Sequence, residues 1–362
     1  MLEKAAEFIK KCKGKTVLVY DTDGDGIGAA VIVAKTLKTL FNKFPVAIPN
    51  SHDENYINEK LYKEILKQKP KFIISLDIPV DEVLTYVLKL AKKSKILVID
   101  HHQINNDLNK FENIIHINPI FLKTKIPPYK YCVSKIVYDL CSKIINIENL
   151  DWLAGVGIIN DLCGEEWKEF LDEIYIKYPE LKGKELYSFN NKLGYIAHLV
   201  SSGYYFGNKY RKLGYKVCLE ASSSLDLIKA KTPLSKQLKK LYEKVENEIK
   251  NIMKNWKKDA EIIESKKLIF LRLKTKMLIQ SPISTKISLE KPDYTIVVIN
   301  TSGKKAYISL RRRDRKVDCG KLAGKVVKGF EKANGGGHVP AAGANILKKD
   351  LEEFKKRIIS KL

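Results

Sequence analysis

Carboxylates and histidines stand directly after three short apolar runs of this sequence. One run is followed by Asp21-Thr22-Asp23-Gly24-Asp25-Gly26, a later one by Asp77, and the next by Asp100-His101-His102. Asp161 stands further along, in a segment with helical spacing. Acidic side chains that gather in one crevice repel one another and lose solvation, so such a cluster is tolerable when divalent cations neutralise it.

Oxygen and imidazole ligands of this kind suit hard divalent cations. Carboxylates combined with histidine nitrogens and open water positions favour Mn²⁺ or Mg²⁺, and Zn²⁺ also accepts them. Two such ions about 3.5–4 Å apart can bridge a phosphoryl oxygen and generate hydroxide for in-line attack. The residue types therefore indicate hydrolysis of a phosphate ester.

Alternating strands and helices would bring these residues together. We expect strands at Thr16–Tyr20, Val46–Pro49, Phe72–Leu76 and Ile96–Ile99, and helices at Ala29–Leu40, Asn58–Lys67 and Asp81–Lys92. This alternation predicts an α/β fold with a mostly parallel, doubly wound sheet. Ligands of such sheets bind beyond the carboxyl ends of the strands, which is where the acidic motifs stand.

Each motif taken singly has a plainer interpretation. The run from Asp21 could be a calcium loop, but its twelfth position is Ile32 where that loop needs Glu. Asp77 could cap a helix before Pro79, the two histidines could lie on the surface, and Asp161 could make a buried hydrogen bond. The combination at three separate strand ends favours a metal centre.

The rest of the chain predicts a helical region and a second domain. We expect core helices at Ser134–Ile145 and Asp151–Leu162, mixed helices and loops over Glu165–Lys192, a long helix at Leu234–Lys257, strands at Lys267–Leu273, Tyr294–Asn300 and Ala306–Arg311, a helix near Val317–Phe330, a loop at Asn334–Gly343, and a final helix near Leu351–Ser360. The predicted domains are 1–233, with a core over 1–164, then a connecting helix over 234–260 and a smaller α+β domain over 261–362.

Charge is unevenly distributed along the 362 residues, whose formal net charge is +24. Residues 261–362 hold 24 Lys+Arg and 10 Asp+Glu, a net of +14. This surplus favours a polyanionic partner such as nucleic acid, although a solvated lysine-rich surface would give the same count.

Composition also bears on the compartment. The sequence has no apolar run long enough for a membrane span and no apolar leader, so we expect a cytoplasmic protein without a membrane partner. Its six cysteines form no C-x-x-C pair, which favours reduced, buried thiols.

The acidic motifs resemble, in order and spacing, those of the DHH phosphoesterases. Gly335-Gly336-Gly337-His338 is similar to the signature of their DHH-associated C-terminal domain. The D-x-D-x-D-G form of the first motif resembles RecJ-type nucleases. Pyrophosphatase and small-oligonucleotide branches usually carry a histidine where this chain has Val19. The resemblance therefore favours a RecJ-like nuclease of archaeal type.

The resemblance also implies roles for individual residues. Asp23, Asp25, Asp77, His101 and Asp161 would ligate two divalent ions, Mn²⁺ preferred and Mg²⁺ accepted, with Asp77 bridging. His102 would contact the scissile phosphate, Asp100 would orient a histidine, and Asp21 would support the metal site. Ser309, Arg311, Gly335, Gly336, Gly337 and His338 would bind phosphate or nucleic acid.

Some of these residues have competing interpretations. The three glycines could form only a flexible turn, and Arg311-Arg312-Arg313 could be a solvated strand edge with one or two side chains pointing away. Tyr204-Tyr205-Phe206 could stack on bases or pack in the core. His52, His116 and His198 belong to no motif, so we interpret them as structural.

The function predicted from this resemblance is that of a metal-dependent exonuclease on single-stranded DNA, with RNA as a further substrate class. The alternatives are a DHH hydrolase of short oligonucleotides, cyclic dinucleotides or phosphoadenosine phosphate, and a non-catalytic replication or repair scaffold. Implied protein partners are the replicative helicase complex (GINS) or the Hef repair helicase, and an oligomer is compatible with the sequence. The sequence does not indicate the polarity of digestion.

Overall fold

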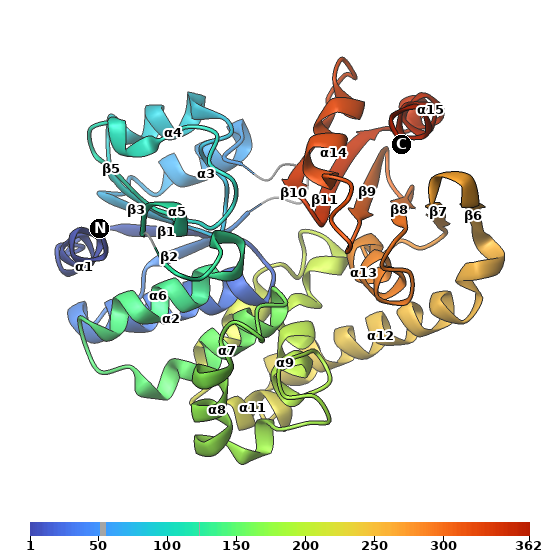
Figure 1. The fold of residues 1–362 in the computed structure, drawn as a ribbon. Helices are drawn as coiled ribbons and strands as arrows, with labels where there is room; N and C mark the ends of the chain where they lie inside the picture. The colour runs from blue at the N-terminus through green and yellow to red at the C-terminus, as the bar shows by residue number, and fades with distance from the viewer. Residues whose placement is uncertain (51–55, 123) are drawn as a thin grey trace. The chain divides into compact units, whose positions relative to one another are not determined.

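The computed structural model describes residues 1–50, 56–122 and 124–362, which form two compact units (Figure 1). Unit 1 comprises Met1–Tyr204 and Asn208–Tyr242, and unit 2 comprises Tyr205–Gly207 and Glu243–Leu362. Helix α12 (Pro233–Asp259) begins in unit 1 and ends in unit 2. No described helix is both long and apolar enough to cross a membrane.

The described part of unit 1 contains one parallel sheet of five strands. They are β1 (Thr16–Tyr20), β2 (Val46–Pro49), β3 (Phe72–Leu76), β4 (Lys95–Ile99) and β5 (Ile114–Ile117). Their order is β2-β1-β3-β4-β5, and every neighbouring pair is parallel. The predicted α/β fold is confirmed. Strand β5 was not predicted, because its four residues include the polar His116.

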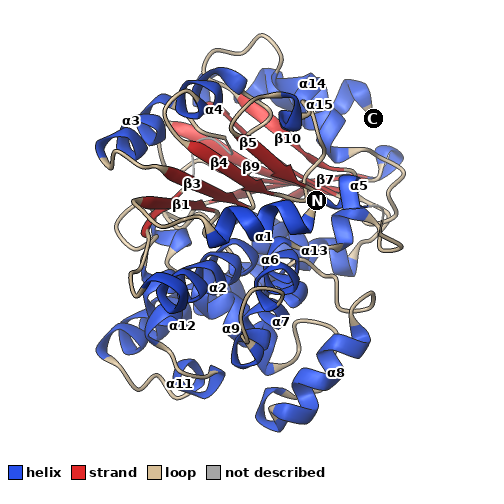
Figure 2. Cartoon of the chain, turned by 90° about the vertical axis from the view of Figure 1, so that its left-hand side faces the viewer, coloured by secondary structure: helices blue, strands red, loops and turns tan. Residues whose placement is uncertain are grey.

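Helices cover both faces of this sheet, as Figure 2 shows. Helices α3 (Glu59–Lys67) and α4 (Leu84–Ala91) lie on one face, and α1 (Leu2–Lys10), α2 (Gly24–Phe41) and α6 (Val133–Ser142) lie on the other. Strand β1 is buried along its whole length, as its apolar run requires. Asn58 lies outside α3 and caps it through a bond from Leu61 N, and α4 begins three residues later than predicted, at Leu84.

The remaining helices of unit 1 are α5 (Pro119–Leu122), α7 (Asp151–Asn160), α8 (Lys168–Lys177), α9 (Lys192–Ser201), α10 (Leu213–Glu220) and α11 (Ser224–Ile228). Of these, α7, α9 and α10 pack against α2, whereas α8 packs against α7 and α11 against α9. Helix α7 contacts α2, α6 and α9, so nearly all of its residues are buried. It ends at Asn160, and Asp161 therefore lies just past the helix rather than inside it.

Unit 2 is built on a mixed sheet in the order β10-β11-β9-β8-β7-β6. Its strands are β6 (Ala260–Ile263), β7 (Leu268–Leu273), β8 (Thr295–Asn300), β9 (Lys305–Arg311), β10 (Asn334–His338) and β11 (Ala341–Leu347). The unit 2 part of α12 and helix α13 (Gln280–Glu290) pack with one apolar cluster, and α14 (Cys319–Val327) and α15 (Leu351–Lys361) pack with the other.

The predicted loop at Asn334–Gly343 is wrong, because these residues form the antiparallel pair β10 and β11. Glycine runs disfavour strands in isolation, but here the missing side chains allow close approach to α14. A Cβ on Gly335 would lie 2.8 Å from the carbonyl oxygen of Ala323. Strand β6 and helix α13 were also missed.

This contact predicts the effect of a single methyl group. Gly335→Ala should lower the free energy of unfolding of unit 2 by about 1–3 kcal/mol, since backbone must move to admit the Cβ. Gly303→Ala is the matched control, because a Cβ there meets nothing within 4 Å. Urea denaturation followed by circular dichroism measures both; equal stability of the two variants would contradict the assigned contact.

Candidate metal centre

The acidic motifs converge at the carboxyl ends of three adjacent strands. Asp21–Asp25 follow β1, Asp77 follows β3 and Asp100–His102 follow β4, and these strands are neighbours in the order β1-β3-β4. Asp161 reaches the same place from the end of α7. Unit 1 thus brings together every residue that the sequence assigned to the metal centre.

Three groups of potential ligand atoms contain Asp77, and one of them joins it to Asp100 and His102. The other two are formed by the predicted metal ligands and Asp21. The ligand atoms of Asp21, Asp23 and Asp77 lie within 4.8 Å of one another, and so do those of Asp25, Asp77 and His101. His101 Nε2 lies 3.5 Å from Asp77 Oδ1 and 3.5 Å from Asp161 Oδ2. Asp77 is common to both groups, which is the position expected of a bridging carboxylate.

The turn between β1 and α2 is held by its own side chains. Asp23 caps α2, and its Oδ1 accepts hydrogen bonds of 3.0 Å from the backbone N–H groups of Asp25 and Gly26. A Cβ on Gly26 would lie 2.4 Å from the carbonyl oxygen of Asp21, so only glycine fits there. The motif therefore combines an N-cap with an obligatory glycine.

Asp25 is fixed at the junction of three helices. Its Oδ2 accepts a 2.7 Å hydrogen bond from Val133 N and its Oδ1 a 2.8 Å bond from Ser134 N, at the start of α6. A Cβ on Gly157 of α7 would lie 2.4 Å from Asp25 Oδ1, so glycine makes room for the carboxylate. Sequence reasoning missed Gly157 and the α6 terminus, because no local pattern marks either one.

Asp77 adopts a backbone conformation that is costly for its residue type. Its φ angle is +60°, in the left-handed region, and its N–H donates to the carbonyl oxygen of Ile99 over 3.0 Å. Non-glycine residues in this region persist when the surroundings impose them, and they cluster at functional sites.

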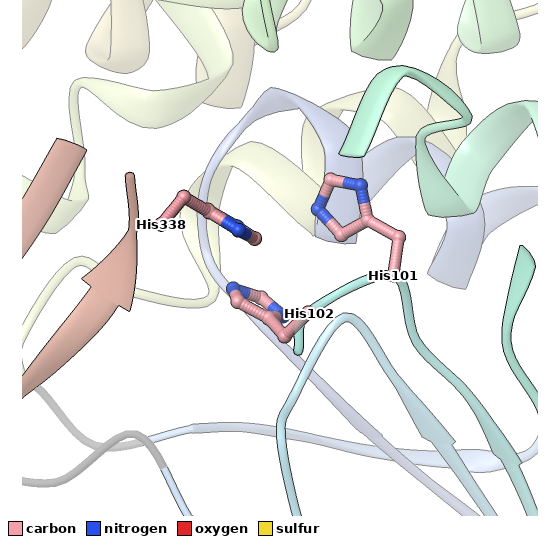
Figure 3. Close-up of side chains that lie close together, drawn as sticks. All are labelled: His101, His102 and His338. Atoms are coloured by element: carbon pink, nitrogen blue, oxygen red, sulfur yellow. The ribbon is translucent and has the colours of Figure 1, made fainter. Parts of the chain in front are cut away.

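His101 and His102 follow β4 on one loop, and their rings are nearly perpendicular at 82° with centroids 5.1 Å apart (Figure 3). His102 Nδ1 lies 2.7 Å from Asp100 Oδ1, and the backbone N–H of His102 donates to Asp100 Oδ2 over 3.1 Å. Asn118, also missed, donates from Nδ2 to the His102 carbonyl oxygen over 3.0 Å. Asp100 therefore orients His102 and not His101.

The pKa values of the two histidines are shifted in opposite directions. Burial and the neighbouring charge of His102 lower the pKa of His101 to about 3, which leaves a neutral ring with a lone pair for a metal. Loss of solvation alone would lower the pKa of His102, but the charge and hydrogen bond of Asp100 raise it to about 9. His102 is thus a cation suited to meet a phosphate oxygen.

The carboxylates fit divalent cations. Burial, followed by repulsion from neighbouring carboxylates, raises the pKa of Asp77 and of Asp161 well above the ordinary value and raises that of Asp21 to about 7. Burial likewise raises the pKa of Asp23 and of Asp25. Within the described residues, the buried Oδ2 of Asp161 accepts no hydrogen bond. Oxygen-rich, charge-crowded donors with an open lone pair suit divalent metal ions.

The predicted phosphate-binding residues lie in unit 2, on β9 and β10. Strand register places Arg311 opposite Ala341 and Ala341 opposite His338, so Arg311 and His338 share one face of the sheet. Gly336 pairs with Gly343 on the same two strands as His338 and Ala341. Ser309, buried beneath α13, shares a 2.8 Å hydroxyl hydrogen bond with Ser284.

Arg311 is held by hydroxyl groups rather than by an acid. Its Nη2 donates to Ser281 Oγ over 2.9 Å and its Nε to Thr285 Oγ1 over 3.3 Å, both on the unpredicted helix α13. No ion pair joins it to a described carboxylate. Arg312, by contrast, pairs with Asp314 through two bonds of 2.7 and 3.0 Å, and is structural. Arg311 is therefore a cation whose charge no described acid compensates.

The remaining candidates have structural surroundings or lie outside the description. His116 is buried with its ring against Phe121, and the His198 ring contacts Phe189. Tyr205 and Phe206 pack against the apolar cluster of unit 2, as core packing requires. His52 lies outside the described residues.

Comparison with known proteins identifies two family domains in the chain. Residues 15–175 match the "DHH family, N-terminal domain" and residues 266–362 match the "DHHA1 domain". No curated protein sequence shows a significant match.

Solved structures share the fold at low sequence identity. A structure titled "Member of s1p family of ribosomal proteins PF0399 DHH domain" has a TM-score of 0.74 and 15% identity, covering 99% of this chain and 90% of its own. RecJ from Thermus thermophilus in complex with Mn²⁺ has a TM-score of 0.74 and 14% identity. The match covers 99% of this chain and 54% of the RecJ chain.

Another solved structure with this fold is that of an enzyme whose name specifies a dinucleotide substrate. The pGpG-specific phosphodiesterase PggH from Vibrio has a TM-score of 0.50 and 15% identity, covering 96% of this chain and 98% of its own. At these identities the structures show the fold alone, and the family domains carry the assignment. With a DHH domain followed by a DHHA1 domain, the chain belongs to the DHH phosphoesterase family.

Proposed function

We propose that this protein is a RecJ-like exonuclease that hydrolyses single-stranded DNA, or RNA, with two divalent metal ions, Mn²⁺ preferred. The observation that carries the proposal is the pair of ligand groups that share Asp77 at the strand ends. The similarity in fold to RecJ with bound Mn²⁺ supports it.

Each residue of the metal centre would have its own role in this reaction. Asp23, Asp25, His101 and Asp161 would hold the cations, with Asp77 shared between them and Asp21 supporting the site. The bound ions supply Lewis acidity and lower the pKa of water. With Nδ1 bonded to Asp100, the protonated His102 presents Nε2–H to a phosphate oxygen and stabilises the negative charge that develops there.

Unit 2 would hold the strand by its phosphates. Arg311 is a fixed guanidinium without an acidic partner among the described residues, which suits it to bind a phosphate by two hydrogen bonds. The net charge of +14 over residues 261–362 adds a favourable field for a polyanion.

The main alternative is a hydrolase of short oligonucleotides or small nucleotides. The fold shared with the pGpG-specific phosphodiesterase keeps this alternative open to test. Against it, Val19 is fully buried in the apolar cluster beneath α3 and α4, so the position where the small-substrate branches carry a histidine offers no ligand. A non-catalytic scaffold is disfavoured because every ligand type is present.

Removal of the shared ligand should abolish cleavage but spare binding. Asp77→Asn is expected to reduce Mn²⁺-dependent digestion of 5′- or 3′-labelled strands by more than about 100-fold, since even residues that only orient a metal ligand cost about 10–100-fold. Binding of the strand should change little. Asp107→Asn, which alters a helix cap in the loop after His102, is the matched control.

The same assay, run on DNA and RNA over a series of lengths, separates the alternatives. An exonuclease degrades long strands progressively from one labelled end, whereas a small-substrate hydrolase slows steeply as the strand lengthens. Wild-type protein that leaves long strands intact with Mn²⁺ would refute the exonuclease.

Loss of Arg311 should weaken binding without affecting the metals. Arg311→Ala is expected to reduce strand affinity and lower the slope of log affinity against log salt by about one, because one phosphate contact is lost. Arg272→Ala, which removes an exposed arginine of β7, is the control. Fluorescence anisotropy in EDTA over a salt series measures both; identical slopes in all three proteins would exclude the contact.

The Asp100–His102 pair predicts a pH effect in the metal-free protein. Because the pKa of His102 is raised to about 9 and that of Asp100 is lowered to about 2, the pair stabilises the fold fully between pH 3.8 and 6.5. This contribution is lost as pH rises through 9 or falls through 2. In Asp100→Asn the pKa of His102 should fall well below 9. NMR titration of the ring protons measures it, and a midpoint that stays near 9 would contradict the assigned pair.

A further inference from the structure

Asn160, the last residue of α7, joins two carboxylates of the metal centre. Its Nδ2 donates to Asp23 Oδ2 and to Asp161 Oδ1, each over 3.0 Å. Its Oδ1 accepts a 3.3 Å hydrogen bond from the backbone N–H of Gly24. The Nδ2 group of one amide thus donates to two acidic side chains that are far apart in the sequence.

The orientation of the amide follows from its partners. The Gly24 N–H can only donate, so the amide oxygen faces it and the NH₂ group faces the two carboxyl groups. A flipped amide would place its oxygen between two carboxylates and its NH₂ against an N–H group, so it would lose every one of these bonds. A Cβ on Gly24 would lie 2.8 Å from Asn160 Oδ1, so the glycine permits this approach.

The amide also decides which oxygens stay open. Asp23 Oδ1 accepts from Asp25 N and Gly26 N, and its Oδ2 accepts from Asn160. In Asp161 the amide binds Oδ1 alone, which leaves the buried Oδ2 facing His101 Nε2 at 3.5 Å. The free oxygen of Asp161 is therefore the one aimed at the histidine ligand.

Asn160 joins a carboxylate of one ligand group to a carboxylate that lies beside the other group. Asp23 belongs to the group with Asp21, and Asp161 lies beside His101 of the other group. We propose that Asn160 is a positioning residue that fixes the spacing of these two groups and so couples the two cation positions. This inference rests on the proposed metal-dependent function, because it assumes that both groups bind divalent cations.

Other residue types could not perform this task. Alanine would remove both donors and free Asp161 to rotate. Aspartate would keep the size of the side chain but replace the donors with a third carboxylate beside Asp23 and Asp161, adding repulsion. The amide of Asn160 supplies two N–H donors to the two carboxylate oxygens without adding a charge.

Calorimetric titration with Mn²⁺ alone tests the inference without any substrate. Asn160→Ala should weaken Mn²⁺ binding by about 10–100-fold, the usual effect of a residue that orients metal ligands. Electron paramagnetic resonance should show loss of the coupled signal of a Mn²⁺ pair. Asn160→Asp should lower the melting temperature in EDTA further than Asn160→Ala does, since it adds charge to the crowded cluster.

The control is Asn109→Ala, which removes another bridging amide, one that bonds the backbone of His116 and the side chain of Asp107 and none of the five aspartates of the metal centre. It should leave Mn²⁺ affinity and pair coupling unchanged. Wild-type Mn²⁺ affinity and coupling in Asn160→Ala would overturn the inference. If wild-type protein binds a coupled Mn²⁺ pair but cleaves no nucleic acid, the proposed function fails while the role of Asn160 stands.

Discussion

Repulsion among buried carboxylates is the constraint on which the rest of this structure depends. Five aspartates, Asp21, Asp23, Asp25, Asp77 and Asp161, meet at one end of a parallel sheet, and burial raises the pKa of each. Repulsion from neighbouring carboxylates adds to this for all of them except Asp25. A polypeptide that assembles such a cluster must supply donors for it. Here the hydrogen-bond donors are backbone N–H groups and one side-chain amide. In the proposed function, two cations also neutralise the carboxylates.

The fold supplies most of these donors through the starts of helices. The first turn of α2 binds Asp23, and the first turn of α6 binds Asp25, where the helix dipole also favours negative charge. Among the described residues, no backbone hydrogen bond is a leading influence on the pKa of Asp77 or Asp161, and burial raises both pKa values well above the ordinary value. The least satisfied carboxylates are thus the ones beside His101, where a metal ion would gain most.

The parts that sequence predicted and missed differ in the range of their interactions. Strands β1 to β4 and the residues after them were predictable, because an apolar run and the polar residue that follows it are neighbours in the chain. Asn160 accepts a hydrogen bond from Gly24, which is 136 positions away in the sequence. Helix α13 supports Arg311 through hydroxyl groups, and the sequence spacing of these hydroxyl residues does not distinguish α13 from an ordinary polar segment. Strand β10 was missed because the reason for its glycines is their close approach to α14, which the sequence does not show.

The left-handed backbone of Asp77 has a consequence for how this protein can change. Glycine would occupy that φ angle without strain and would remove one charge from a crowded cluster, so it would favour the metal-free fold. Stability and chemistry therefore pull in opposite directions at one position. A lineage released from catalysis would be expected to lose this aspartate early, whereas a working enzyme must carry its cost in every generation.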